Sequence, residues 1–218
     1  MSEDKENWFL FDSGNCEPQE NMLIDKILLE KSAVIGRPLL RLYGWKIPAG
    51  SYGFFQKETE IEKITTIRPL VKRPTGGGFV PHINDWTYSL VFPPNHYWYR
   101  LKAVNSYQRL HQWICEAFKF LGIETELAPE SVKPLPGQCF IGYEKYDLLR
   151  NGLKIAGAAQ RRTKTGMLIQ GSVQPVPKTV SFSDWKSALV KSASTFLNAT
   201  FSDFVPNNYE FFKNSVNF

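Results

Sequence analysis

Residues 73–82 read RPTGGGFVPH, and the glycine loop Gly76–Gly78 within this stretch decides how the surrounding chain is interpreted. Glycine weakens regular structure and is used where the backbone adopts a positive φ or approaches a ligand closely. Backbone N–H groups in such a loop form a concave site that suits an anion or a carbonyl oxygen. Arg73 stands at the end of a strand predicted over 70–73, and its guanidinium suits the same ligands. The stretch therefore predicts a ligand-binding loop.

A second informative segment, Tyr146–Val173, reads YDLLRNGLKIAGAAQRRTKTGMLIQGSV. Asn151-Gly152 lies between two apolar runs, which is a strong signal for a two-residue hairpin turn. Lys154 follows this turn, and strand alternation puts it on the opposite face from Leu153 and Ile155. The next residues are small, so the lysine is predicted to reach across an open pocket. An ordinary solvated lysine is the alternative.

Together these segments resemble the lipoate–protein ligase A family and the related cysteine-dependent octanoyltransferases. The resemblance spans roughly Trp8–Val173 and rests on FDSG (Phe11–Gly14), NMLID (Asn21–Asp25), RPTGGG (Arg73–Gly78), His82, DWTYSL (Asp85–Leu90) and NGLKIAGAAQRR (Asn151–Arg162). It implies an α/β fold with a mixed, largely antiparallel central sheet flanked by helices, like class II synthetases and biotin/lipoate ligase catalytic domains. It implies catalytic roles for Lys154 and, in a transferase, Cys139, and ligand-binding roles for Arg73, Thr75, Gly76, Gly77, Gly78, His82, Asp147, Gly157 and Ala158, with no metal ligands.

Two chemical routes fit this resemblance, and both attach an eight-carbon acyl chain to a lysine of a lipoyl-domain protein. A ligase converts lipoate or octanoate to an acyl-adenylate with ATP and Mg²⁺, and fixed donors stabilise the tetrahedral oxygen. A transferase needs no ATP, because a cysteine takes octanoyl from a carrier-protein thioester and passes it on. Cys139, in PLPGQCF (Pro134–Phe140), is the candidate nucleophile, and a nearby Lys154 ammonium favours its thiolate. A buried, purely structural Cys139 is the alternative.

The chain departs from the family pattern at informative places. Ligases usually carry Asn-Asp-Leu where this chain has Tyr146-Asp147-Leu148, which weakens the adenylate route. Gly78 is the ligase form of the loop, since the transferases place a bulkier residue there. Ile83 and Asn84 separate His82 from Asp85, so no role is assigned to Asp85. On balance the sequence narrowly predicts a lipoate–protein ligase, with an octanoyltransferase as the alternative.

The presence of Lys154 and of RPTGGG also argues against two more remote functions. A non-catalytic lipoyl-carrier binding partner would not need Lys154. A biotin ligase would carry a loop rich in arginine and glycine in place of RPTGGG. The implied partners are acidic lipoyl-domain proteins, such as the E2 subunits of 2-oxoacid dehydrogenases and the glycine cleavage H protein, and acyl carrier protein for a transferase. Arg161 and Arg162 are candidate contacts for the acceptor.

Composition is consistent with one catalytic domain over residues 1–218 and no accessory C-terminal domain. The chain has 218 residues, 43% of them hydrophobic, which is enough for one well-filled core. The net charge of +5 is uneven, because residues 1–30 hold eight acidic and two basic residues. We expect no nucleic-acid partner, no membrane partner and a cytoplasmic location, because no long apolar stretch or signal peptide is evident. Three scattered cysteines predict neither a disulfide framework nor a zinc site.

Periodicity predicts the main elements. Helices are predicted over 21–33, 107–121 and 183–197, the last capped by Ser183. Strands are predicted over 39–45 and 51–56, around a turn at 48–50, and over 86–92 as a half-buried strand ended by Pro93-Pro94. Tyr43, Tyr52 and Phe79 are predicted to line the acyl pocket. Residues 201–218 are left unassigned.

Overall fold

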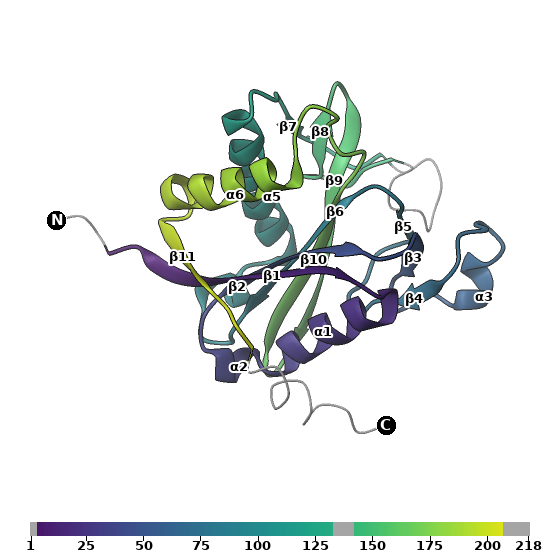
Figure 1. The fold of residues 1–218 in the computed structure, drawn as a ribbon, viewed down its shortest axis with the longest axis horizontal. Coiled ribbons are helices and arrows are strands. Elements are labelled where there is room, and N and C mark those ends of the chain that lie inside the picture. The colour runs from purple at the N-terminus through teal and green to yellow at the C-terminus, as the bar shows by residue number, and fades with distance from the viewer. Residues whose placement is uncertain (1–3, 133–141, 207–218) are drawn as a thin grey trace.

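The computed structural model describes residues 4–132 and 142–206, and a mixed eight-stranded sheet dominates this part of the chain (Figure 1). Its strand order is β11-β1-β2-β6-β10-β9-β8-β7. Strand β1 pairs in parallel with β11 and β2, and the remaining pairs are antiparallel. The strands are β1 (Glu6–Cys16), β2 (Leu39–Trp45), β6 (Trp86–Phe92), β7 (Glu126–Leu127), β8 (Leu148–Arg150), β9 (Leu153–Thr163), β10 (Gly166–Val173) and β11 (Ala199–Asp203). The predicted α/β class with a largely antiparallel sheet is confirmed.

A smaller sheet and the helices complete the described fold. The small sheet has the order β4-β3-β5, with β3 (Ala49–Tyr52), β4 (Leu70–Lys72) and β5 (Val80–His82). The helices are α1 (Pro18–Glu30), α2 (Ser32–Ile35), α3 (Glu58–Ile61), α4 (Tyr97–Arg100), α5 (Ala103–Phe120) and α6 (Phe182–Phe196). In Figure 1, α5 and α6 cover one face of the large sheet, and α1 lies along the other. No helix in the described ranges combines the length and apolar character needed to span a bilayer.

Strand β6 shows how the two helical layers bury the sheet. Its boundaries match the prediction, but all seven of its residues are buried, so the expected half-buried strand is wrong. Trp86, Tyr88, Leu90 and Phe92 belong to the large core cluster that includes α5 and α6 residues. Ser89 points to the other face and donates a hydrogen bond to Asp25 of α1 at 2.7 Å. The polar alternate residues are therefore partnered inside the protein.

Other boundaries differ for identifiable reasons. The predicted helix 21–33 begins earlier, with Pro18 at its first position, and is followed by the short α2. Helix α5 also begins earlier than predicted. The cap of α6 is Ser181 rather than Ser183, because Ser181 and Asp184 form a reciprocal capping box. Strand β3 contains Ala49 and Gly50, which were assigned to a turn, and it ends at Tyr52.

Candidate active site

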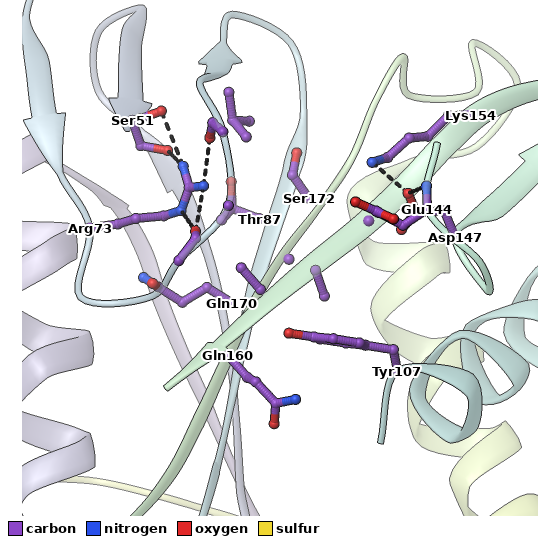
Figure 2. Close-up of a pocket in the computed structure, with 18 of the residues that line it drawn as sticks. Ser51, Arg73, Thr87, Tyr107, Glu144, Asp147, Lys154, Gln160, Gln170 and Ser172 are labelled. Atoms are coloured by element: carbon purple, nitrogen blue, oxygen red, sulfur yellow. Dashed lines mark hydrogen bonds and ion pairs between the residues drawn. The ribbon is translucent and has the colours of Figure 1, made fainter. Parts of the chain in front are cut away.

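A cavity of about 770 Å³ lies between the small sheet and the β8–β9 hairpin. Figure 2 shows its two sides: Arg73 and Ser51 lie on one, and Lys154, Asp147 and Glu144 on the other. We call Ser51, Arg73, Gly76–Gly78 and His82 the glycine wall. We call Glu144, Asp147, Lys154 and Gly157 the lysine wall. The residues of both walls line the cavity, and the N-terminal turns of α5 contribute Ala103, Val104 and Tyr107.

The lysine wall is organised around one buried ion pair. The Asn151-Gly152 turn has positive φ at both residues, 51° and 73°, and delivers Lys154 at the start of β9. Lys154 Nζ lies 2.7 Å from Asp147 Oδ2, and the two side chains are 8% and 7% exposed. The same carboxylate oxygen accepts a hydrogen bond from the Glu144 N–H at 2.8 Å. The Lys154 ammonium group is thus held at the cavity by a carboxylate that is itself fixed.

Gly157 provides the space that this lysine occupies. A Cβ added at Gly157 would lie 2.6 Å from both Cε and Nζ of Lys154, and 3.1 Å from Asp147 Oδ1. A larger side chain at this position would displace the end of the lysine. Gly157 is therefore needed for the placement of Lys154.

On the glycine wall, the guanidinium of Arg73 is engaged with the protein itself. Its Nε and Nη2 donate to Gly76 O at 3.0 and 2.7 Å, and Nη2 donates to Gly78 O at 2.6 Å. Its Nη1 donates to the carbonyl and hydroxyl oxygens of Ser51, each at 3.2 Å. Gly53 packs directly against the glycine loop, since a Cβ at Gly53 would lie 2.0 Å from Gly77 O. Arg73 therefore determines the shape of the glycine loop.

His82 connects this wall to the central sheet. Its Nε2 lies 2.8 Å from Ser51 Oγ, and its Nδ1 lies 2.8 Å from Asp85 Oδ2. A carboxylate only accepts hydrogen bonds, so Nδ1 carries a proton and donates to Asp85. The imidazole stacks on the Trp45 ring at 3.9 Å between centroids. The two residues between His82 and Asp85 do not prevent this contact. The expectation that Asp85 has no role is therefore wrong, because Asp85 binds His82.

Asp85 is the point where several cavity hydrogen bonds meet. Thr87 and Ser172 donate their hydroxyls to the same Asp85 oxygen at 2.8 and 2.7 Å. Burial raises the pKa of Asp85, but its contact with His82 and these two hydroxyls outweigh burial and hold the pKa below its ordinary value. The carboxylate is therefore ionised at neutral pH and positions His82.

The floor of the cavity rests on a second polar cluster. Asp25 forms a fully buried ion pair with Arg41 at 2.8 Å, and it also accepts from the Tyr43 hydroxyl at 3.0 Å. Gln170 donates its amide to Asp25 at 2.7 Å and accepts from the Thr75 hydroxyl at 2.7 Å. Burial, together with the neighbouring Asp25 carboxylate, raises the pKa of Tyr43 well above its usual value. Tyr43 and Gln170 line the cavity, so this cluster links its floor to the glycine loop.

The structure gathers most of the predicted site residues around this cavity. The predicted residues that line it are Arg73, Gly76, Gly77, Gly78, His82, Asp147, Lys154, Gly157 and Ala158. Thr75 is fully buried and contacts the cavity residue Gln170 instead. Of the three aromatic residues predicted to line the acyl pocket, Tyr43 does so, whereas Tyr52 and Phe79 pack in a separate small cluster.

Sequence reasoning missed Asp85, Ser51, Gln170 and the buried Asp25–Arg41 pair. One signal was present in the printed sequence. Arg41 interrupts the apolar run LLRLYGW, and Asp25 lies one helical turn after Asn21, beside Leu28 and Ile24 on the apolar side of α1. Charged residues inside apolar patterns are buried only when they are paired.

The three cysteines differ in what the structure describes of them. Cys139 lies outside the described residues. Cys16 is buried, and burial raises the pKa of its thiol. Cys115 is partly buried, and its Sγ lies 3.2 Å from Thr125 O. Both described cysteines are free thiols with packing roles.

Comparison with known proteins identifies relatives over most of the chain. The family model "Lipoyl protein ligase A/B catalytic domain" matches residues 17–192. The octanoyltransferase LipM of Anoxybacillus flavithermus is 36% identical over 184 residues, 78% of this chain and 66% of its own length. That of Geobacillus kaustophilus is 36% identical over 183 residues, with the same coverage. The chain thus spans slightly less than two thirds of the curated relatives it matches.

Solved structures show the same fold. A lipoate-protein ligase A bound with ATP superimposes with a TM-score of 0.73 at 18% identity, covering 97% of this chain and 92% of that chain. At this identity the likeness concerns the fold alone. The sequence prediction of a ligase is wrong as the main function, because the relatives at 36% identity are named octanoyltransferases. The alternative prediction agrees with them.

Proposed function

Because the chain belongs to the lipoyl protein ligase A/B catalytic domain family, we propose that it is an octanoyltransferase. It takes an octanoyl group from a carrier thioester and attaches it in amide linkage to a lysine of an acceptor protein. The observation that carries the proposal is the buried Lys154–Asp147 pair at 2.7 Å on the cavity, in a chain whose close relatives are named octanoyltransferases.

Cys139 is the proposed nucleophile. In the first step its thiolate attacks the thioester carbonyl, a new S–C bond forms, and the donor thiol leaves and takes up a proton. In the second step the acceptor lysine attacks this enzyme thioester, the amide forms, the amine loses a proton and the cysteine is released. Ser131 and Gly142, which flank the segment containing Cys139, line the cavity.

Lys154 supplies positive charge in both steps. Its ammonium favours the Cys139 thiolate and stabilises the oxyanion that forms on the octanoyl carbonyl. Asp147 keeps the ammonium in place, and in a poorly solvated cavity such fixed charge acts more strongly than in water. Gly157 and Ala158 leave room for the acyl carbonyl next to it.

The glycine wall supports a route without ATP. A triphosphate is commonly bound by cationic side chains that reach it with donor groups. Here Arg73 directs its guanidinium to Gly76, Gly78 and Ser51. We therefore assign the glycine loop to binding the acyl chain and its carbonyl. His82 and Asp85 support it indirectly, because Ser51 contacts both His82 and Arg73.

The proposed acceptors are acidic lipoyl-domain proteins, and the proposed donor is octanoyl acyl carrier protein. The relatives' name supports an octanoyl group as the one transferred, and the excess of basic residues after position 30 supports acidic partners. Opposite net charge accelerates the encounter of two proteins and orients them.

The test is acylation of a purified apo lipoyl domain in two separate reactions. One supplies octanoyl carrier protein, and the other supplies octanoate or lipoate with ATP and Mg²⁺. We expect product only from the carrier thioester, and no product when Cys139 is changed to alanine. Cys115→Ala is the matched control, because Cys115 is not among the residues that line the cavity and its thiol contacts Thr125. Product that requires ATP and survives Cys139→Ala would refute the proposal.

A further inference from the structure

The turn Gly53–Gln56, between β3 and α3, displays the most exposed large apolar side chain among the described residues. Phe55 is 89% exposed, and the adjacent Phe54 is 40% exposed. The two rings meet edge to face with centroids 5.3 Å apart. A phenylalanine as exposed as Phe55 gains little for the fold, and together with the less exposed Phe54 it forms an apolar surface suited to contact with a partner.

This turn is firmly attached to the glycine wall. The Phe54 N–H donates to Thr75 O at 2.9 Å, and the Gln56 N–H donates to Gly53 O at 2.9 Å. Gly53 packs so tightly on Gly77 that a Cβ would lie 2.0 Å from its carbonyl oxygen. Gln56 itself lines the cavity. The aromatic pair is therefore held in a fixed position at the rim of the candidate active site.

Two cationic side chains lie against the Phe54 ring of this pair. The Arg161 guanidinium carbon lies 4.3 Å from the Phe54 ring centroid, and Lys72 Nζ lies 5.3 Å from it. Arg161 is fixed further by a hydrogen bond to Pro74 O at 3.1 Å. The nearby Glu58 carboxylate accepts the Tyr52 hydroxyl at 2.8 Å. The surface thus combines an apolar contact with positive charge, which suits an acidic protein with an apolar patch.

The geometry of the proposed reaction determines which partner covers it. An acceptor lysine reaches the cavity only by the length of one side chain, so the acceptor domain must lie against the cavity rim. Gln56 belongs to that rim, and Phe55 is its immediate neighbour.

We propose that the turn Gly53–Gln56, with Lys72 and Arg161, is the surface on which the acidic acceptor domain docks to present its lysine. This inference rests on the proposed function and adds a recognition surface to it. Phe55 is the apolar anchor of the interface, and Lys72 and Arg161 attract the acidic residues around the acceptor lysine.

The experiment separates the two half-reactions. The first measures octanoyl-enzyme formation from octanoyl carrier protein by intact-protein mass, and the second measures single-turnover transfer to an apo lipoyl domain over a range of acceptor concentrations. For Phe55→Ala we expect octanoyl-enzyme formation within about twofold of wild type and an acceptor half-saturation concentration raised by about tenfold. Lys72→Glu raises it less, and its effect shrinks with added salt.

Phe120→Ala is the matched control. Phe120 is 57% exposed at the end of α5, about 24 Å along the helix axis from the cavity residue Val104. It should leave both half-reactions unchanged. An unchanged acceptor half-saturation in Phe55→Ala would overturn the docking proposal, as would an equal loss in both half-reactions.

A failure of the proposed function is seen separately. If wild type forms no octanoyl-enzyme, the affinity of the protein for the apo lipoyl domain is measured directly by calorimetry. Tighter binding by wild type than by Phe55→Ala supports the docking surface in that case, and equal affinity refutes it.

Discussion

The two walls of the cavity differ in the partners of their cationic side chains, Arg73 and Lys154. On the glycine wall, Arg73 is 5% exposed and gives its donors to Gly76, Gly78 and Ser51. On the lysine wall, the Lys154 ammonium is held by Asp147 at the cavity surface, among small residues. One wall therefore uses positive charge to build its own backbone, and the other presents positive charge to a ligand. On this difference we base the proposal that the lysine wall supplies the catalytic charge and that the glycine wall is a binding scaffold.

The largest expected effect comes from removing the ammonium. Lys154→Ala should slow transfer to the acceptor by about 10²–10³-fold, because the oxyanion loses its fixed positive charge. Lys154→Arg keeps the charge with a different shape and should recover part of the rate. Single-turnover rates at saturating acceptor measure both. A rate within a few-fold of wild type in Lys154→Ala would remove the distinction between the two walls.

Arg73→Lys tests the opposite wall. A lysine keeps the charge but cannot bridge Gly76, Gly78 and Ser51, so several buried charged hydrogen bonds are lost. We expect a loss of about 3 kcal/mol in the free energy of unfolding, measured with urea, and a smaller fall in turnover than for Lys154→Ala. Unchanged stability with abolished turnover would show that Arg73 binds substrate directly.

A pair of glycine substitutions sharpens the comparison. Gly157→Ala places a methyl group against Lys154 Cε and Nζ, so turnover should fall by about tenfold while stability changes little, because the displaced atoms end a flexible side chain. Gly76→Ala on the glycine wall meets no heavy atom within 4 Å. Because the glycine loop is assigned to the acyl chain, the added methyl should raise the half-saturation concentration for the octanoyl donor and leave the rate at saturating donor close to that of wild type. Equal effects of the two substitutions would contradict the assignment.

Acid should weaken the region behind the lysine wall first. His111 Nδ1 donates to Tyr146 O at 2.6 Å, next to Asp147, and burial lowers the pKa of His111. Below about pH 6.5 the unfolded chain takes up a proton that the folded protein does not. The free energy of unfolding should therefore decrease as the pH is lowered below about 6.5, by up to about 1.4 kcal/mol per pH unit.

Asp85, behind the glycine wall, affects the free energy of unfolding at lower pH than His111 does. Its folded pKa is lowered, so its stabilisation is complete above about pH 3.9 and is lost as pH falls further. Urea unfolding of wild type and His111→Asn between pH 7 and 5 separates the two groups. The slope should be reduced in the variant, and an identical slope would assign the effect to other residues.

Sequence patterns predicted the elements that carry a clear period or a strong turn signal. Strands β2 and β6 have the predicted boundaries, and Asn151-Gly152 forms the expected turn. In the small sheet, β4 was predicted almost with its observed boundaries and β3 was predicted to start two residues late, whereas β5 was missed because a strand of three residues is too short to show a period. Polar residues on buried faces, such as Ser89 and Asp25, were not predicted to be buried, since their partners come from distant segments.

The same limit applied to the site and its chemistry. Lys154 and the glycine loop were recognisable by local composition, whereas the contact of His82 with Asp85 depends on the path of a turn. Gly78 was interpreted as the ligase form of the loop. In the structure its carbonyl accepts a hydrogen bond from Arg73 at 2.6 Å.

The most direct test of a cysteine-linked transfer uses the protein and octanoyl carrier protein alone, without ATP or acceptor. Intact-protein mass should show one octanoyl group on wild type and on Cys115→Ala, none on Cys139→Ala, and slower loading of Lys154→Ala. An unmodified wild-type protein that acylates a lipoyl domain only from free acid and ATP would contradict this account.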